Sequence, residues 1–287
     1  MAADTYYGSV SLLLPCNGTN NGTLFTDYSG LLLRATATGN AKTSTTQYKY
    51  YDSSGYFDGN GDYLAIAANS AFDQTGDFTV EAWVRPGAIG SQMQIFGANS
   101  STNFLQLQIS SAGKATVNRA GSTDVVTGTT TLSTNTWYHL AFCKSGSTTT
   151  LYVDGTAEGT PYSYSGAANS AALAVGGGTN SSYYFNGYIQ DVRITKAARY
   201  SGDFTAPGKL IGYRLSGTTR DANGNPAAQT VSAHCRLGPR QTAVTTSDGS
   251  TGAYSFSNLV ETEHFIVCQD DAAGDDFNDL ILRATPA

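Results

Sequence analysis

The sequence predicts an all-β protein made of two tandem antiparallel β-sandwiches, and three observations favour this fold class. Only 13% of the residues are charged, whereas Gly (32) and Tyr (18) are abundant, a composition typical of strands joined by tight turns. Many short runs alternate apolar and polar residues with the period of two that a half-buried strand requires. No helical periodicity persists along the chain, which disfavours a mainly helical fold.

Strand-like runs fill the chain from about Val10 to Phe204. Residues 78–85 alternate apolar side chains with others and predict a half-buried strand. Residues 104–109 and 137–143 are further β-rich runs. Residues 149–153 lead into Asp-Gly, the dipeptide that best tolerates positive φ in a two-residue turn, so a hairpin is expected there.

The tripeptide Ala-Pro-Gly at residues 206–208 marks a boundary, because Pro and Gly together end regular structure. We expect a first sandwich over 10–206, a second over 207–287, and a candidate N-terminal arm over 1–9. In the second part, strands are predicted at about 210–215, 229–235, 242–246, 254–256 and 264–269. Their spacing is typical of a small sandwich.

Charge and hydropathy argue against two classes of partner. The formal net charge is -6 and the pI is about 4.9, with no local Lys/Arg cluster, so a nucleic acid partner is not expected. The apolar run around Leu12 to Leu14, like every other in the sequence, falls far short of the roughly 20 residues that cross a bilayer, so membrane insertion is not expected. The first residues lack the basic and apolar regions of a secretory signal.

Six motifs, in order along the first 204 residues, resemble the laminin G-like, concanavalin A-like lectin-type domains of tailed-bacteriophage virion proteins. The resemblance implies a concanavalin A-like jelly roll over residues 10–206. The motifs are VSLLL (10–14), FTDYSG (25–30), YFDGNGDYL (56–64), DFTVEAWV (77–84), FNGYIQDVRITK (185–196) and ARYSGDF (198–204).

The C-terminal part resembles carboxypeptidase regulatory-like, or transthyretin-like, domains. This resemblance implies a small transthyretin/Ig-like sandwich that acts as a spacer or docking module and carries no chemistry of its own. The motifs are VSA (231–233), TSDG (246–249), GAYSF (252–256) and FNDLI (277–281), the last of which recurs at the end of such modules in phage tail proteins.

The sequence offers little for catalysis. Glycosidases need two carboxylates across the sugar, and Glu81 stands alone on its predicted strand. A depolymerase would therefore need a hidden carboxylate partner for Glu81. The histidines, His139, His234 and His264, lie in no metal-ligand pattern, and His139 is interpreted as a structural residue of a core strand. We predict that the protein is not an enzyme.

No cofactor is expected, with Ca²⁺ as the open alternative. Asp58, Asn60 and Asp62 are alternately spaced oxygen donors in a Gly-rich turn that resembles the start of a calcium loop, but no bidentate Glu closes it. The alternative is an Asx-rich turn before a strand. The acidic stretch over 270–279 could likewise bind a cation or form a solvated loop.

The four cysteines do not form a zinc pattern, because none has CxxC spacing. Cys235 and Cys268 fall in the same C-terminal segment on predicted strands and could form a disulfide. Single buried thiols are the alternative.

Two clusters combine aromatic rings with polar groups, as sugar binding requires. Tyr183, Tyr184 and Asn186 follow the polar residues 180–182. Tyr50 and Tyr51 form the second cluster, next to Tyr48, Tyr56, Gln47 and Asp52. Enrichment in Tyr and Asn also marks protein–protein surfaces, so both interpretations stay open.

The resemblances and the lack of catalytic motifs predict a structural virion protein of a tailed bacteriophage, as a decoration, collar, baseplate or tail component. It would be assembled in the host cytoplasm, contact other virion proteins, and be multimeric in the assembly. The alternative is a receptor-binding adhesin that recognises host cell-surface polysaccharide. An adhesin would bind cells by itself, whereas a decoration protein would bind only the virion.

Overall fold

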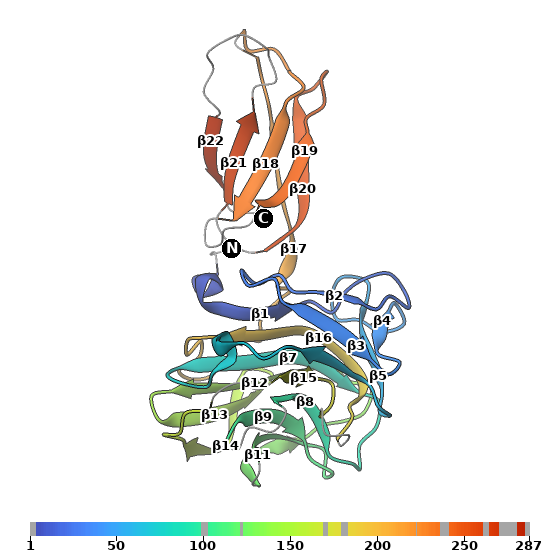
Figure 1. Cartoon of the computed structure of the whole chain (residues 1–287), viewed down its shortest axis with the longest axis vertical. Helices are drawn as coiled ribbons and strands as arrows, with labels where there is room; N and C mark the ends of the chain where they lie inside the picture. Colours follow the sequence, from blue (N-terminus) through green and yellow to red (C-terminus); the bar gives the residue numbers. More distant parts are fainter. Residues whose placement is uncertain are drawn as a thin grey trace. The chain divides into compact units, whose positions relative to one another are not determined.

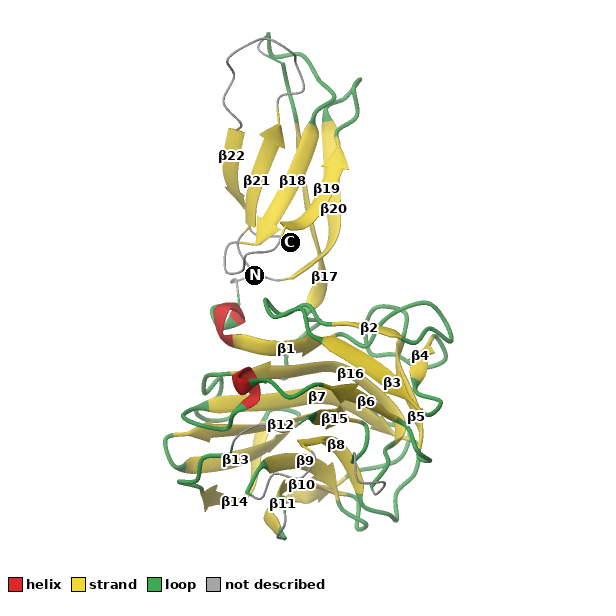
Figure 2. Ribbon diagram, in the orientation of Figure 1, coloured by secondary structure: helices red, strands yellow, loops and turns green. Residues whose placement is uncertain are grey.

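The computed structural model describes residues 4–98, 103–120, 123–168, 172–178, 183–221, 223–235, 241–260, 264–269 and 280–284. The chain divides into two compact units, Ser9–Lys209 and a second that combines Leu210–Ala287 with Met1–Gly8. Each unit is built from antiparallel strands, which confirms the all-β fold class (Figure 1). Within the described residues, helix is confined to two short 3₁₀ segments, η1 (Tyr7–Ser9) and η2 (Ser70–Phe72) (Figure 2).

The first unit contains two eight-stranded sheets. Sheet A contains, in spatial order, β14 (Thr156–Ser163), β13 (Thr148–Val153), β12 (Tyr138–Ser145), β7 (Phe78–Pro86), β16 (Asn186–Thr195), β5 (Ser54–Asp58) and β4 (Lys42–Ser44), and β1 (Val10–Leu14) also pairs with β16. Sheet B contains β11 (Asp124–Thr131), β10 (Lys114–Arg119), β9 (Leu105–Ile109), β8 (Met93–Ala98), β15 (Leu173–Val175), β6 (Tyr63–Ile66), β3 (Arg34–Thr38) and β2 (Leu24–Thr26).

The core of the first unit lies between these sheets and follows the alternation of the strands. On β7, Phe78, Val80, Ala82 and Val84 are buried in this core. The intervening residues of β7 therefore face the outer side of sheet A, as the period of two requires. The strands predicted around 78–85, 104–109 and 137–143 are confirmed by β7, β9 and β12.

The predicted hairpin is also confirmed. β13 and β14 pair directly, and the two residues between them, Asp154 and Gly155, have φ values of 49° and 86°. These positive values are those of the two-residue turn that Asp-Gly favours.

The second unit contains two smaller sheets around a separate core. One sheet pairs β17 (Ile211–Thr218) with β20 (Ala253–Val260), and the other has the order β19 (Gln241–Thr246), β18 (Thr230–Cys235), β21 (His264–Gln269), β22 (Leu280–Ala284). Its buried apolar residues are Leu215, Val231, Ala233, Tyr254, Phe256, Leu259 and Ile266.

Cys235 and Cys268 do not form the disulfide that the sequence left open, because Cys268 is a free thiol. The register explains this: Cys268 pairs with Val231, whereas Cys235 pairs with His264, so the two cysteines lie four positions apart along the ladder. Cys16 and Cys143 are buried free thiols, as the alternative interpretation expected.

Among the residues that the structure places, none of the helical segments has the length and apolar character needed to cross a membrane.

Candidate functional site

Part of the outer face of sheet A is covered by residues 196–207, which we call the strap. The backbone N–H of Phe204 donates to the carbonyl of Gly155 (2.9 Å), and the indole Nε1 of Trp83 donates to the carbonyl of Pro207 (3.3 Å). The rings of Tyr200 and Phe204 stack with centroids 3.5 Å apart, and both contact Tyr152. The strap therefore closes this part of the face.

Glu81 lies beneath the strap and is 1% exposed. One of its carboxylate oxygens accepts the hydroxyl of Tyr200 (2.5 Å) and lies 3.3 Å from Nε2 of His139. The other pairs with the guanidinium of Arg199 and lies 3.8 Å from Nε of Arg193. Burial alone would raise the pKa of Glu81, but Arg199, His139 and Arg193 together hold it well below its usual range.

The uncovered part of the outer face carries four side chains in one line across four strands. The register pairs Lys42 of β4 with Tyr56 of β5, Tyr56 with Tyr188 of β16, and Tyr188 with Arg85 of β7. We call these four residues the cross-strand row. Because directly paired residues of antiparallel strands point to the same face, all four side chains lie side by side.

Cations and rings alternate in contact along the cross-strand row. The rings of Tyr56 and Tyr188 have centroids 5.1 Å apart and are inclined by 47°. Nζ of Lys42 lies 5.9 Å from the Tyr56 ring centre, and Cζ of Arg85 lies 5.8 Å from that of Tyr188. Each of the four side chains is half-buried, so each ring keeps part of its surface open to solvent.

The phenol of Tyr56 remains neutral at ordinary pH. Burial raises the pKa of Tyr56, and the neighbouring Tyr188, Asp58 and Asp62 raise it further. A neutral phenol offers both a hydrogen-bond donor and an acceptor beside an apolar ring face.

The loop 47–53 is anchored beside the row by one buried amide. Gln190 is 0% exposed and lies two residues after Tyr188 on β16. Its Oε1 accepts the backbone N–H groups of Lys49 (2.9 Å) and Tyr50 (2.8 Å). Its Nε2 donates to the carbonyls of Tyr50 (2.8 Å) and Ser53 (2.5 Å), so four bonds from one side chain fix the loop.

This loop places three more side chains next to the row. The ring of Tyr50 meets Trp83 edge-on at 6.1 Å, and Nζ of Lys49 lies 4.2 Å from the centre of the Trp83 ring. The hydroxyl of Tyr51 donates to the carboxylate of Asp191 (3.0 Å). Tyr51 has a φ of 62°, an unfavourable value for a bulky residue, which the anchored loop maintains.

The structure separates the two predicted sugar-binding clusters. Tyr50 and Tyr51 lie beside the row, whereas the carbonyl of Tyr183 accepts the backbone N–H of Gln94 in sheet B (2.8 Å). Tyr183 is 48% exposed and Tyr184 is half-buried. Residues 180–182, which completed that cluster in the sequence, lie outside the described residues.

Asn186 has a role within the fold. Its Nδ2 donates to the carbonyl of Asp58 (3.0 Å), and its side chain packs against the glycines at 59 and 87. It therefore holds the turn that precedes β6.

The three predicted calcium ligands form the Asx-type turn that was the alternative interpretation. Asp62 is 0% exposed; its Oδ1 accepts the backbone N–H of Asn40 (2.5 Å) and its Oδ2 accepts that of Asp58 (2.9 Å). Asp58 Oδ1 accepts the N–H of Asn60 (2.7 Å). The described residues contain no group of three or more acidic, His or Cys side chains placed to hold a metal, and the stretch 270–279 lies outside them.

Sequence reasoning missed Lys42, Arg85 and Tyr188 as candidate site residues. The strand over 78–85 contained a partial signal, since Arg85 and Trp83 fall on the positions opposite the apolar face. That they meet Tyr188 depends on the pairing of β7 with β16, which no local pattern specifies.

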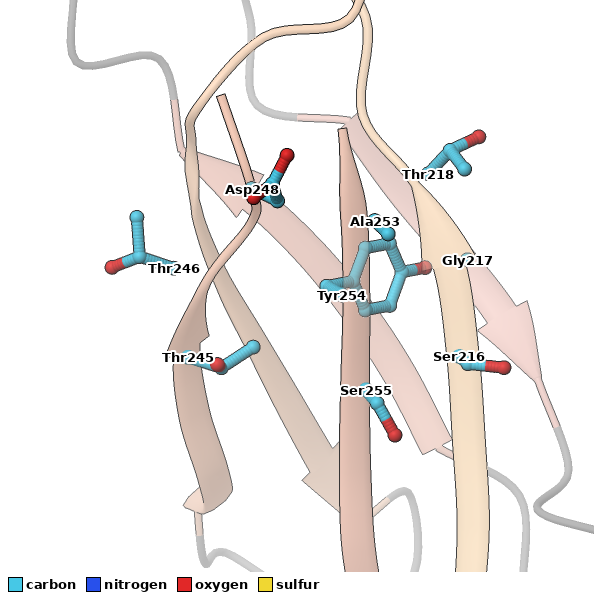
Figure 3. Close-up of a pocket in the computed structure, with 9 residues that line it drawn as sticks. All are labelled: Ser216, Gly217, Thr218, Thr245, Thr246, Asp248, Ala253, Tyr254 and Ser255. Carbon is cyan, nitrogen blue, oxygen red and sulfur yellow. The ribbon is translucent and has the colours of Figure 1, made fainter. Parts of the chain in front are cut away.

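The second unit contains an open hollow with a volume of about 890 Å³, and six of its nine lining residues bear a hydroxyl group (Figure 3). The ring of Tyr254 is buried and fills the space that a side chain on Gly217 would need. Oδ1 of Asp248 accepts the backbone N–H groups of Ser250 (2.9 Å) and Thr251 (2.7 Å). The ring and the carboxylate thus serve the fold, and the lining alone defines no class of ligand. The lining residues are Ser216, Gly217, Thr218, Thr245, Thr246, Asp248, Ala253, Tyr254 and Ser255.

Comparison with known families decides the identity of the first unit. The model described as the concanavalin A-like lectin/glucanases superfamily matches residues 58–203, half of the chain, and these residues carry most of both sheets. The chain belongs to this superfamily. The concanavalin A-like lectin-type fold expected for the first sandwich is thereby established, and the paired β-sheets with a common core are its sandwich.

Solved structures share this fold at low identity. The binding domain of botulinum neurotoxin serotype D is 12% identical with a TM-score of 0.55 (93% of this chain, 74% of that chain). Trypanosoma rangeli sialidase in complex with sialic acid is 15% identical with a TM-score of 0.52 (70% and 32%). Domain 4 of a Geobacillus stearothermophilus extracellular arabinanase in complex with arabinotriose is 16% identical with a TM-score of 0.50 (66% and 93%). The chain thus spans about a third of the sialidase, and no curated protein matches it.

Proposed function

We propose that this lectin-type protein binds carbohydrate without cleaving it, and that the cross-strand row is its sugar-binding surface. The observation that carries the proposal is the pair of half-buried rings, Tyr56 and Tyr188, on an uncovered face of a lectin-type sandwich. Sugars pack their apolar C–H faces on aromatic rings, while their hydroxyls need nearby polar partners. The phenols, Lys42 and Arg85 supply those partners on a rigid sheet.

The surroundings of Glu81 support a non-enzymatic role. A catalytic acid on this fold must reach the scissile oxygen and must work with a second carboxylate. Glu81 is instead buried, and its contacts are with Arg199, His139, Arg193 and the Tyr200 hydroxyl. The low pKa that these cations give it is that of a permanently ionised structural group.

The proposed setting is the virion of a tailed bacteriophage, where the protein serves as a decoration, collar, baseplate or tail component. The order of the six phage-type motifs in the first unit supports this setting. The second unit, which resembles transthyretin-like modules, would be the spacer or docking part that contacts other virion proteins. Recognition of host polysaccharide by the first unit would make the same protein an adhesin.

A binding comparison on an array of bacterial cell-surface polysaccharides tests this proposal. The protein with both Tyr56→Ala and Tyr188→Ala should bind at least about tenfold more weakly than the unchanged protein, since each lost stacking contact contributes about 0.5–1.5 kcal/mol beyond the area it buries. Tyr183→Ala is the matched control, because Tyr183 is equally aromatic, is exposed, and contacts sheet B. Loss of binding in the control alone would assign the sugar to the other cluster. Binding to virions but to no polysaccharide would contradict the sugar-binding proposal.

A further inference from the structure

We infer that the ligand of the cross-strand row is an acidic polysaccharide, and that Lys42 and Arg85 each bind one of its anionic groups. The inference rests on the proposed carbohydrate-binding function and names the class of sugar. Its starting point is the charge of the row, in which a cation closes each end of the tyrosine pair.

The cations on this surface are not neutralised by the protein. Every salt bridge found among the described residues converges on Glu81 beneath the strap, and none involves Lys42, Lys49 or Arg85. This is unexpected in a chain with a formal net charge of -6, where acidic partners outnumber the basic residues. The three cations lie instead against the faces of Tyr56, Trp83 and Tyr188, which leaves them available to an anion.

The carboxylates closest to the row are engaged elsewhere. Both oxygens of Asp62 accept backbone N–H groups, and Asp191 accepts the hydroxyl of Tyr51. Asp58 accepts the backbone N–H of Asn60 within its own turn. These bonds hold the three carboxylates in place, and none of the salt bridges between described residues joins them to Lys42, Lys49 or Arg85.

Binding of a neutral sugar at the cross-strand row would carry a free-energy cost, because it would desolvate the cations without pairing them. A sugar stacked on the two rings removes water from Lys42 and Arg85, and desolvating an unpaired charge carries a free-energy cost. An anionic group beside each ring offsets that cost with a charge-assisted hydrogen bond. Arg85 is already oriented, because its Nη1 donates to Oδ1 of Asn135 (2.9 Å), and its remaining N–H groups are free to form such bonds.

The geometry also sets a minimum length for the ligand. Lys42 and Arg85 lie on strands separated by three spacings, which corresponds to about 14 Å between their backbones. A ligand that contacts both cations must span the two tyrosine rings that lie between them. A chain of several sugars with repeated anionic groups can do so, and once one group is bound, the second binds at a high effective concentration.

The test is equilibrium binding of the full chain to immobilised acidic polymers and their neutral counterparts. The probes are polygalacturonate and hyaluronate, each with its carboxyl-reduced form, and a glycerol-phosphate teichoic acid that distinguishes phosphate from carboxylate. The variant carries Lys42→Gln and Arg85→Gln, and the matched control is Arg34→Gln, an exposed arginine on β3 of sheet B. Both variants are checked for an unchanged thermal unfolding midpoint.

We expect at least one acidic polymer to bind about tenfold or more tightly than its neutral form or than free monosaccharide acid, and the double variant to lose that preference. For the unchanged protein, raising the salt from about 0.01 M to about 0.15 M should weaken acidic binding, since the Debye length falls from about 30 to about 8 Å. Equal binding of acidic and reduced polymers, or acidic binding that Lys42→Gln/Arg85→Gln leaves intact, would overturn the inference while leaving carbohydrate binding in place. No binding to any polysaccharide would overturn both proposals.

Discussion

At the scale of single residues, the same fold uses charged groups in two opposite ways. Glu81 is buried against Arg199, Arg193 and His139, whereas Lys42 and Arg85 form no ion pair on an uncovered face. In the first arrangement the buried carboxylate compensates the arginines, so its removal would be strongly destabilising. The second retains charges that only a ligand would compensate.

Replacement of Glu81 by Gln should destabilise the first unit by about 3–5 kcal/mol, because Arg199 and Arg193 would lose the buried carboxylate that both contact. Glu158→Gln is the matched control: Glu158 is also buried but accepts its hydrogen bonds from the neutral groups of Thr129 and Thr130. Urea unfolding measures both changes. Equal losses would show that charge compensation at Glu81 contributes nothing specific.

Stability should also fall in acid through Glu81. Because the folded state holds the pKa of Glu81 below its ordinary value of 4.5, the ionised carboxylate stabilises the fold above that pH and loses this contribution as the pH falls further. Thermal unfolding midpoints between about pH 7 and pH 3 should therefore drop more steeply for the unchanged protein than for Glu81→Gln. Parallel curves would contradict this role.

Removal of calcium should change neither stability nor sugar binding, because Asp62 already binds two backbone N–H groups. The substitution Asp62→Asn should lower the free energy of unfolding by about 1–3 kcal/mol, because one buried backbone N–H would then face the amide NH₂ of Asn in place of a carboxylate oxygen. Unfolding with and without a chelator measures the first effect. A lower midpoint in the chelator would restore Asp58, Asn60 and Asp62 as calcium ligands.

At the scale of elements, the strap decides which part of sheet A is open. Its attachment to the β13–β14 hairpin depends on Gly155, where a Cβ atom would overlap the carbonyl oxygen of Phe204. Motif similarity placed residues 198–204 within the first sandwich. It did not predict that this segment covers Glu81, because that depends on tertiary packing against β7 and β12.

Gly155→Ala should destabilise the first unit more than Gly146→Ala, which serves as its control. Both glycines have positive φ, so both changes carry about 1–2 kcal/mol of backbone strain. Only at Gly155 would the new methyl group also displace the strap, since nothing lies within 4 Å of a Cβ at Gly146. Urea unfolding of the two variants compares them, and equal destabilisation would show that the strap contact is dispensable.

Alternation within the sequence was sufficient to predict β7, β9, β12 and the hairpin, because each is specified by neighbouring residues. The cross-strand row was not predictable in this way. Its four members come from positions 42, 56, 85 and 188 and meet only through strand register. Tyr50 and Tyr51 were predicted from composition, but their contact with Trp83 and Asp191 depends on the buried amide of Gln190.

At the scale of the whole molecule, the two units have different proposed roles: the first binds sugar, and the second serves as a spacer or docking part. The first contains the aromatic and cationic surface on a lectin-type sandwich. The second contains an open hollow whose lining defines no class of ligand, and the spacer or docking role proposed for this unit rests on its resemblance to transthyretin-like modules. Because a net charge of -6 repels polyanions over the molecule as a whole, an acidic ligand would have to be held by the local cations of the cross-strand row.

The most direct test of this account is a fluorescence titration with a polysaccharide that the protein binds. The chain has two tryptophans, so Trp137→Phe leaves Trp83, whose ring contacts Lys49 and Tyr50 beside the row, as the sole reporter. We predict a saturable change in Trp83 emission with the same Kd as the overall binding, absent when Tyr56→Ala and Tyr188→Ala are added. Full binding with no change in Trp83 emission, and undiminished by those two substitutions, would contradict the account.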